Sequence, residues 1–349
     1  MSQIQKRVLV GLSGGVDSTL TAVTLQEEGY EVEGVYMKLF DNDAFHEINI
    51  EKGKRVADYL GINYHVLDLS NDFKKHVYDP FVKSYKEGKT PNPCGMCNQH
   101  IKFGKLVEFA DELKCEFVST GHYINTDGEF LYQAKDDTKD QTYFLFHINP
   151  AVLKRAIFPM GGKIKNDVKA IVDQIPALKE LAYQRESSEI CFVENTYKEV
   201  LNRHMDTNMP GSVLSVEGDV IGTHTGYMNY TIGQRKGFDT PKHRQRWFVT
   251  KIDAKNNQIT VGELKDLETT KVKIKELNLF FTPETKSFKS TVKVRYRTGK
   301  VPCEVTIEEG GFATITLEEP AMGVAAGQAA AFYDGEKLLG GGWIILDEH

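Results

Sequence analysis

Several features that mark other classes of protein are scarce or missing in this sequence. No apolar run approaches the roughly 20 residues that a membrane-spanning helix needs, so no membrane association is expected. The apolar run within the opening MSQIQKRVLVGLSGG is too short for the core of a signal peptide and predicts a buried strand. The five cysteines, an odd number in 349 residues, argue against a disulfide framework and favour a reducing cytoplasm.

The chain also lacks the positive excess that is typical of nucleic-acid-binding proteins, because its net charge is −6. This average hides an asymmetry. Residues 225–300 contain 17 Lys and Arg against 7 Asp and Glu, which gives +10 for this segment and leaves −16 for the rest. Because phosphate contacts depend on local charge, the segment favours a polyanion as partner. A lysine-rich β surface that only faces solvent is the alternative that charge leaves open.

The first 120 residues alternate between apolar segments and helical patterns. The apolar segments at 7–12, 31–40, 63–70 and 115–120 are separated by helical patterns at 18–28, 48–60 and 98–113. This alternation predicts an α/β fold with a doubly wound parallel sheet. Right-handed crossovers in such a fold place ligands at the carboxyl ends of the strands.

The remaining sequence predicts further domains, since 349 residues exceed one ordinary core. Residues 151–205 have a mostly helical pattern, whereas short β runs separated by glycines follow from about Met209. A hairpin is expected around Asn256–Asn257, and the spacing of the later strands predicts two small β-barrels or sandwiches. We therefore expect a catalytic domain with a helical extension at 1–205, a central β domain at 206–268 and a C-terminal β-barrel domain at 269–349.

The segment GLSGGVDS follows the first strand and opens the first helix. Its glycines let the backbone approach an anion, and a helix N-terminus supplies N–H groups. It lacks the Gly-Lys-Ser/Thr ending of a kinase-type phosphate loop, while Asp17 points to Mg²⁺ or to a pyrophosphate held through metal. A glycine-rich turn with Asp17 as the helix N-cap is the structural alternative. The predicted nucleotide-binding residues are Gly11, Leu12, Ser13, Gly14, Gly15, Val16, Asp17 and Ser18.

This segment resembles the pyrophosphate loop of the ATP pyrophosphatases. The resemblance implies an enzyme that transfers AMP from ATP to a substrate oxygen and releases pyrophosphate. On its own, it does not choose among amide ligases, tRNA lysidine formation and tRNA thiolation.

Further blocks, spread over the whole chain, resemble the tRNA-specific 2-thiouridylases. They include GVYMK at 34–38, TPNPCGMCNQHIKF at 90–103, TGHY at 120–123, KDQTYFLF at 139–146, FPMGGKIK at 158–165, SSEICF at 187–192, GTHTGYMNYTIGQRKGF at 222–238, VRYR at 294–297 and GQAAAFYDG at 327–335.

The family resemblance implies a role for individual residues. Cys97 corresponds to the nucleophile, and Cys191 corresponds to the cysteine that carries sulfur as a persulfide. Met37 and Gly121 correspond to positions that touch the adenine nucleotide. The segment that faces the target base comprises Asn92, Pro93 and Cys94, and the tRNA-contacting positions are His122, Lys139, Asp140, Gln141, Arg295, Tyr296 and Gln328.

The activity that the resemblance implies is an ATP-dependent tRNA 2-thiouridine synthase, a tRNA-uridine 2-sulfurtransferase. It would adenylate O2 of the wobble uridine, position 34, and replace that oxygen with sulfur from a cysteine persulfide. ATP and Mg²⁺ are the expected small molecules. The expected partners are the anticodon arm of tRNA and a sulfur donor such as a cysteine desulfurase or a sulfur-relay protein. We expect the cytoplasm as the location.

Cys94 departs from the family pattern, which usually has Asp at this position, and so leaves three cysteines that could share one site. A zinc site lacks a second Cys-x-x-Cys or Cys/His pair, and a redox pair needs no ATP loop. A [4Fe–4S] cluster on Cys94, Cys97 and Cys191 remains open beside persulfide transfer. Cys115 and Cys303 are interpreted as packing residues.

Two other functions remain as alternatives. Another ATP pyrophosphatase ligase would need an ammonia source or an amino-acid pocket, and the chain shows no glutaminase-type segment. A tRNA- or nucleotide-binding module with structural cysteines would catalyse no turnover of ATP.

Overall fold

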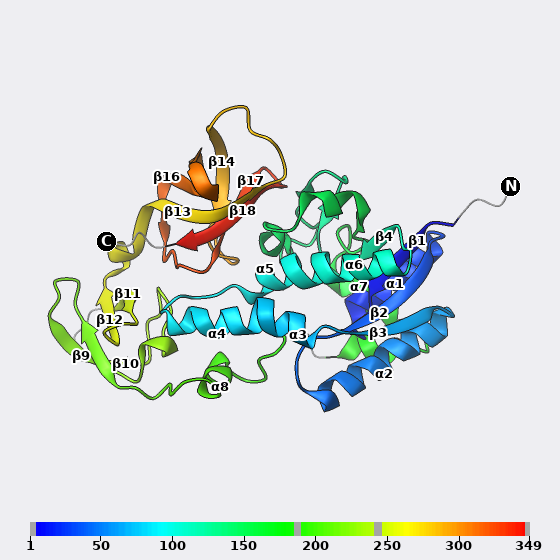
Figure 1. Ribbon diagram of the computed structural model, residues 1–349, viewed down its shortest axis with the longest axis horizontal. Helices are drawn as coiled ribbons and strands as arrows, with labels where there is room; N and C mark the ends of the chain where they lie inside the picture. The colour runs from blue at the N-terminus through cyan, green and yellow to red at the C-terminus, as the bar shows by residue number, and fades with distance from the viewer. Residues whose placement is uncertain (1–4, 185–189, 241–245, 346–349) are drawn as a thin grey trace. The chain divides into compact units, whose positions relative to one another are not determined.

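The computed structural model describes residues 5–184, 190–240 and 246–345 (Figure 1). Packing divides the chain into two units, each described by itself. The first unit comprises residues 1–77, 94–188 and 335–339, and the second comprises residues 78–93, 189–334 and 340–349.

The first unit contains a five-stranded sheet with the order β3-β2-β1-β4-β7, and every neighbouring pair in it is parallel. Its strands are β1 (Arg7–Gly11), β2 (Glu31–Lys38), β3 (Asn63–Asp68), β4 (Phe117–Ser119) and β7 (Ala156–Ile157). The chain adds β2 and β3 on one side of β1, then β4 on the other. The connectivity therefore reverses between β1 and β4, where open α/β sheets bind their ligands.

The central strand β1 is buried on both faces, which is why its sequence is one apolar run. Val8, Leu9 and Val10 are fully buried, because helices cover both faces of a parallel sheet. The predicted doubly wound α/β fold is confirmed.

Helices connect the strands of the first unit. The α-helices are α1 (Val16–Glu27), α2 (Asp43–Leu60), α3 (Ser70–Phe73), α5 (Pro93–Cys97), α6 (Leu106–Glu112) and α7 (Lys165–Asp173). Two segments are π-helical, η1 (Lys74–Tyr78) and η2 (Asn98–Lys105), and three are 3₁₀-helical, η3 (Thr142–Leu145), η4 (Pro150–Arg155) and η5 (Lys179–Tyr183). Helix α1 packs against α2 and α7, while α6 packs against β1 and β4.

Local signals set several of these boundaries. Gly61 ends α2 in the left-handed conformation, with φ of 64°, which glycine adopts without strain. In the described residues of 151–205, which exclude 185–189, the helices are short, whereas the pattern predicted a mostly helical segment. A small hairpin, β5 (Asn125–Thr126) with β6 (Leu131–Tyr132), also lies in this unit, where β6 pairs with Lys337 and Leu338.

The second unit begins with helix α4 (Asp79–Lys86) and includes α8 (Tyr197–Asn202). A five-stranded sheet follows, in the order β10-β9-β8-β12-β11. Its strands are β8 (Gly211–Leu214), β9 (Val220–His224), β10 (Phe238–Asp239), β11 (Phe248–Asp253) and β12 (Gln258–Gly262), with the short helices η6 (Tyr227–Asn229) and η7 (Leu264–Leu267) beside them. The predicted hairpin around Asn256–Asn257 is confirmed, since β11 and β12 pair antiparallel across it.

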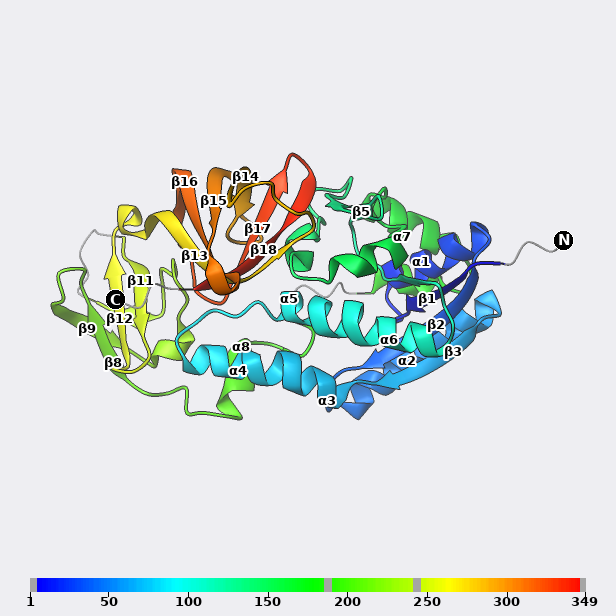
Figure 2. The same cartoon turned by 45° about the horizontal axis from the view of Figure 1, so that its top comes forward.

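Six long strands complete the second unit and close into a barrel, because β13 pairs with both β16 and β18 (Figure 2). They are β13 (Glu268–Leu279), β14 (Ser287–Lys293), β15 (Val301–Ile307), β16 (Ala313–Met322), β17 (Ala329–Asp334) and β18 (Lys337–Ile345), with the short helix η8 (Glu309–Gly311) between β15 and β16. Within the part of the chain that the structure describes, no helix is both long and apolar enough to cross a membrane.

Candidate active site

The loop between β1 and α1 lies at the carboxyl end of the central strand. The Ser13 backbone N–H donates to the Ser18 hydroxyl at 3.2 Å, and that hydroxyl donates to the Gly15 carbonyl at 3.0 Å. Gly14 has φ of +77°, and a Cβ there would lie 2.7 Å from Cβ of Lys52. Both the conformation and the space therefore require glycine. The result is a tight turn whose backbone is open to an anion.

The structural alternative required Asp17 to be the N-cap of α1. The structure contradicts this alternative. The N-cap is Gly15, which makes no side-chain cap. The Asp17 carboxylate instead accepts from Nζ of Lys165 at 2.6 and 2.7 Å, and from the Tyr123 hydroxyl at 2.7 Å. The Lys165 side chain is only 8% exposed, and its backbone N–H is fixed by the Asp136 carboxylate at 2.9 Å. A buried ammonium is thereby held beside the anion-binding loop.

The start of α1 is closed on its other side by Gly121. A Cβ at this position would lie 2.9 Å from the Ser18 nitrogen and 3.0 Å from Cβ of Asp17. Met37, near the end of β2, lies beside Gly11 at the carboxyl edge of the sheet. A Cβ added to Gly11 would lie 3.4 Å from Cε of Met37. The structure therefore brings the predicted nucleotide-binding residues together where the sheet connectivity reverses.

Cys94 and Cys97 lie on α5, one helical turn apart. Cys97 is 6% exposed, whereas Cys94 is exposed. Burial raises the pKa of the Cys97 thiol to about 11, opposed by the charge of Lys102. Desolvation by the surrounding atoms also raises the pKa of Cys94, although part of that residue reaches solvent, and Lys102 opposes this rise as well. Both side chains are therefore protonated thiols at neutral pH.

Lys102, whose charge acts on both thiols, follows Cys97 by five residues. It lies in the segment from Asn98 to Lys105, which is π-helical rather than α-helical.

His122 lies beside the same helix. Its Nδ1 is 2.6 Å from the Thr120 hydroxyl, and its ring packs 5.8 Å from that of Phe103. Burial, together with the charge of Lys102, holds the pKa of His122 well below its usual value, so the ring is neutral. The residue is 5% exposed, so a direct contact with tRNA, as the resemblance implies, would require local opening.

Cys191 lies in the second unit and is exposed. The next residue, Phe192, packs edge-on against Phe81 at 5.2 Å and lies 5.5 Å from Tyr78. Aromatic contacts therefore fix the segment at Phe192 and leave the neighbouring thiol at the surface.

The predicted tRNA-contacting run at 139–141 is largely turned inward. The Asp140 carboxylate is 3% exposed and accepts from the Thr142 hydroxyl at 2.7 Å. The Gln141 side chain accepts from the Tyr123 backbone N–H at 2.9 Å and so helps to shape the loop that carries Tyr123. Lys139 and Gln141 are both half-buried, so Asp140 is the buried residue of the three.

Gln328 also contacts the protein. Its Nε2 donates to the carbonyls of Thr90 and Pro91 at 3.0 and 3.1 Å, within the second unit. These two residues precede Asn92 and Pro93, both of which are buried. Gln328 therefore holds the turn that leads into α5.

The basic segment at 225–300 lies in the second unit. Its predicted tRNA residue Arg295 donates to the Ile232 carbonyl at 2.6 Å, and Nζ of Lys293 lies 5.9 Å from the ring of Tyr296. Lys293, the last residue of β14, and Arg295 thus lie near one aromatic ring, that of Tyr296, and both Arg295 and Tyr296 are half-buried.

The sequence reasoning missed three residues of the site: Lys165, Tyr123 and Lys102. All three lie inside blocks that were quoted for the resemblance, FPMGGKIK, TGHY and TPNPCGMCNQHIKF.

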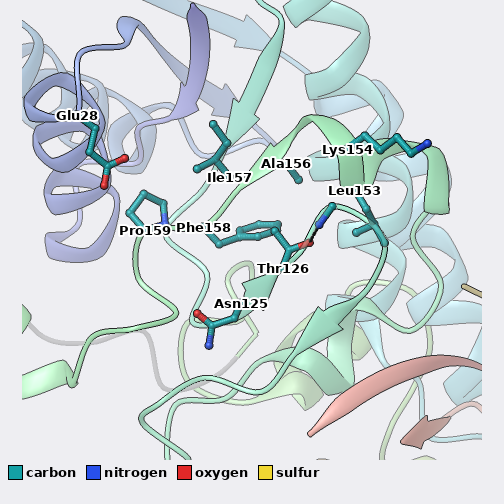
Figure 3. Close-up of a pocket in the computed structure, with 10 residues that line it drawn as sticks. Glu28, Asn125, Thr126, Leu153, Lys154, Ala156, Ile157, Phe158 and Pro159 are labelled. Carbon is teal, nitrogen blue, oxygen red and sulfur yellow. Dashed lines mark hydrogen bonds between the residues drawn. The ribbon is translucent and has the colours of Figure 1, made fainter. Parts of the chain in front are cut away.

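One pocket measures about 350 Å³ and includes Glu28, Asn125 and Lys154 in its lining (Figure 3). None of the residues 11–18 of the phosphate loop lines this pocket. Among residues 5–184, 190–240 and 246–345, no three His, Cys, Asp or Glu side chains form a group that could hold a metal ion.

Comparison with known proteins decides the family. The models that match are described as the tRNA methyl transferase HUP domain at residues 6–195, the tRNA methyl transferase PRC-barrel domain at 198–263 and the aminomethyltransferase β-barrel domain at 269–344. The tRNA-specific 2-thiouridylase MnmA of Sulfurimonas denitrificans is 50% identical over 98% of this chain and 99% of its own length. MnmA of Nitratiruptor sp. is 51% identical over 98% of this chain and its full length. The chain belongs to the tRNA-specific 2-thiouridylase family.

Membership of this family accounts for both parts of the architecture. The parallel sheet corresponds to the HUP domain, a nucleotide-binding fold, and the β sheet and barrel correspond to the two C-terminal barrel models. Among solved structures, the U34-tRNA thiolase NcsA from Methanococcus maripaludis with its [4Fe-4S] cluster is 20% identical, covers 57% of this chain and 64% of that chain, and has a TM-score of 0.36. This likeness is too low to carry an argument about mechanism.

Proposed function

We propose that this protein is an ATP-dependent tRNA 2-thiouridine synthase that acts on the wobble uridine, position 34. The observation that carries the proposal is the identity of about 50% to 2-thiouridylases over nearly the whole chain. The site geometry supports it, because an anion-binding loop and a buried thiol lie in the same unit. The proposed domains are the catalytic region 1–205 and two tRNA-binding regions, 206–268 and 269–349.

The first step is activation of the uridine. Oxygen O2 of uracil is a poor leaving group, and its attack on the α-phosphate of ATP converts it into an adenylate. The backbone N–H groups of residues 11–18 bind phosphate oxygens, and the ammonium of Lys165 neutralises charge on the departing pyrophosphate. Asp17 is the loop carboxylate that would hold Mg²⁺ together with the phosphates of ATP, and the ion would neutralise charge on those phosphates. In the free protein, both oxygens of that carboxylate accept from Nζ of Lys165, so the ion would share the carboxylate with this ammonium or displace it.

The second step is sulfur transfer. The terminal sulfur of a persulfide on Cys191 attacks C2 of the activated base, and AMP leaves. The Cys97 thiolate then attacks the Cys191 sulfur, which forms a Cys97–Cys191 disulfide and leaves the transferred sulfur on the base. The charge of Lys102 favours the thiolate of Cys97, whereas burial of this thiol raises its pKa to about 11.

The base must leave the anticodon stack to reach a thiol that is 6% exposed. The basic segment at 225–300 would hold the anticodon arm through phosphate and shape contacts. Sulfur would arrive from a cysteine desulfurase or a sulfur-relay protein that reaches the exposed Cys191, in the cytoplasm.

Mass analysis of tRNA nucleosides tests this proposal. Unmodified tRNA should gain 2-thiouridine only when ATP, Mg²⁺ and a persulfide source are all present. Cys97→Ser and Cys191→Ser should abolish the product while tRNA binding is retained, and Cys303→Ala, which removes a buried barrel thiol, should leave it unchanged. Thiolation by Cys97→Ser at the normal rate would overturn the proposal. Iron and labile sulfide in an anaerobic preparation would replace the persulfide step by the cluster alternative.

A further inference from the structure

The exposed Cys94 lies one helical turn before the buried Cys97, at a position where the family resemblance implies an aspartate. Because its pKa is raised, Cys94 is a neutral thiol and does not reproduce the acceptor role of a carboxylate. A second thiol beside the nucleophile provides chemistry that an aspartate lacks, namely disulfide exchange.

We propose that Cys94 is a resolving cysteine that transfers the product disulfide from the Cys97–Cys191 pair to a Cys94–Cys97 pair. The inference rests on the proposed function, which generates that first disulfide. The Cys94 thiolate attacks the Cys97 sulfur, the Cys97–Cys191 bond breaks, and the electron pair leaves on Cys191. Cys191 is then free to receive sulfur again, and an external dithiol later reduces the Cys94–Cys97 disulfide to two thiols.

The helix geometry fits this exchange. Residues three apart on an α-helix have Cα atoms about 5 Å apart, from a rise of about 1.5 Å per residue and a radius of about 2.3 Å. Disulfides span Cα separations of roughly 4.4–6.8 Å, so the two cysteines of α5 can be joined without unfolding the helix. Gly95 lies between them and lets the backbone adjust.

The difference in exposure between Cys94 and Cys97 makes the exchanged disulfide easier to reduce. Cys97 is 6% exposed, so a reductant has poor access to a disulfide that ends on its sulfur. Cys94 is exposed and offers the reductant a sulfur atom at the surface. The thiolate is the form that attacks and leaves, and the charge of Lys102 partly offsets the rise in pKa that burial causes at both cysteines.

Disulfide mapping after one turnover tests the proposal. The full chain is loaded with persulfide by a cysteine desulfurase, mixed with tRNA and ATP without reductant, quenched in acid, alkylated and digested. We expect the Cys94–Cys97 disulfide to exceed Cys97–Cys191 at least tenfold per mole of thiolated product, with Cys191 alkylated. Cys94→Ser should reverse this ratio whatever its first-turnover rate, and Cys94→Asp, which restores the family residue, should behave like Cys94→Ser.

Several outcomes would overturn the proposal, and they are distinct from failure of the proposed function. A predominant Cys97–Cys191 disulfide in the wild-type protein, with thiolated tRNA formed, refutes only the resolving role. An absence of thiolated tRNA refutes the proposed function. In that case a second experiment tests whether Cys94 pairs with Cys97. One equivalent of diamide, added without substrates, should form the Cys94–Cys97 disulfide before any other. A different first disulfide refutes the pairing. Cys303→Ala serves as the matched control and should keep the wild-type pattern in both experiments.

Discussion

Replacement of Gly121 by alanine is the most specific perturbation of the nucleotide site that the structure offers. The new Cβ would lie 2.9 Å from the Ser18 nitrogen, 3.0 Å from Cβ of Asp17 and 3.1 Å from its carbonyl carbon. Ordinary contacts begin at 3.4 Å, so the start of α1 must move by about 0.5 Å. Two of the three neighbours are backbone atoms, which have no alternative rotamer to adopt.

The expected cost follows from this displacement. Overpacking of this kind typically costs about 1–3 kcal/mol of folding free energy. A misplacement of about 1 Å can reduce a rate about 100-fold, so a shift of half that size should reduce kcat/KM for ATP on the order of tenfold or more. Gly162→Ala is the matched control, because a Cβ there meets no atom within 4 Å. It should change neither quantity appreciably.

The assay is tRNA-dependent release of pyrophosphate, with urea unfolding in parallel. The reasoning would be refuted if Gly121→Ala kept the ATP kinetics of the wild-type protein. An equal loss in Gly162→Ala would show that the effect is not specific to the phosphate loop.

Three further predictions concern other contacts of the site. Lys165→Met should lower kcat/KM for ATP on the order of 100-fold and the free energy of unfolding by about 1–3 kcal/mol, because it leaves the partly exposed Asp17 carboxylate without its cation. A normal rate of pyrophosphate release would contradict this prediction. The rate of Cys97 alkylation in the free protein should rise about tenfold per pH unit from pH 8 to near the pKa of about 11, because only the thiolate reacts. Peptide mass analysis measures this rate. A plateau below pH 9 would show that the thiol is not desolvated. Gln328→Ala should lower kcat several-fold with little change in tRNA affinity, because it removes the hydrogen bond that holds the turn at Pro91. A tenfold weaker Kd for tRNA with a normal kcat would instead identify a direct contact between Gln328 and tRNA.

The sequence predicted best those elements that depend on local signals. The buried strand β1 follows from a short apolar run, and the hairpin at Asn257 follows from its turn residues. The helical expectation for residues 151–205 was too extensive, because apolar spacing there reflects short helices that are broken repeatedly.

Contacts between distant residues could not be predicted in this way. Lys165 meets Asp17 across 148 residues, and Gln328 meets Thr90 across 238. The placement of Lys102 depends on π-helical winding, which has no simple sequence period. The resemblance therefore named residues at the site, whereas only the structure distinguished those that face inward, such as Asp140, from those that face solvent.

The central claim is that ATP activates the uridine oxygen which sulfur then replaces. Transcribed tRNA carrying ¹⁸O at O2 of the wobble uridine tests it most directly, with the AMP released during thiolation analysed by mass spectrometry. The account predicts that the heavy oxygen appears in AMP in proportion to the 2-thiouridine formed. Thiolated tRNA accompanied by unlabelled AMP, or formed without any AMP, would contradict it.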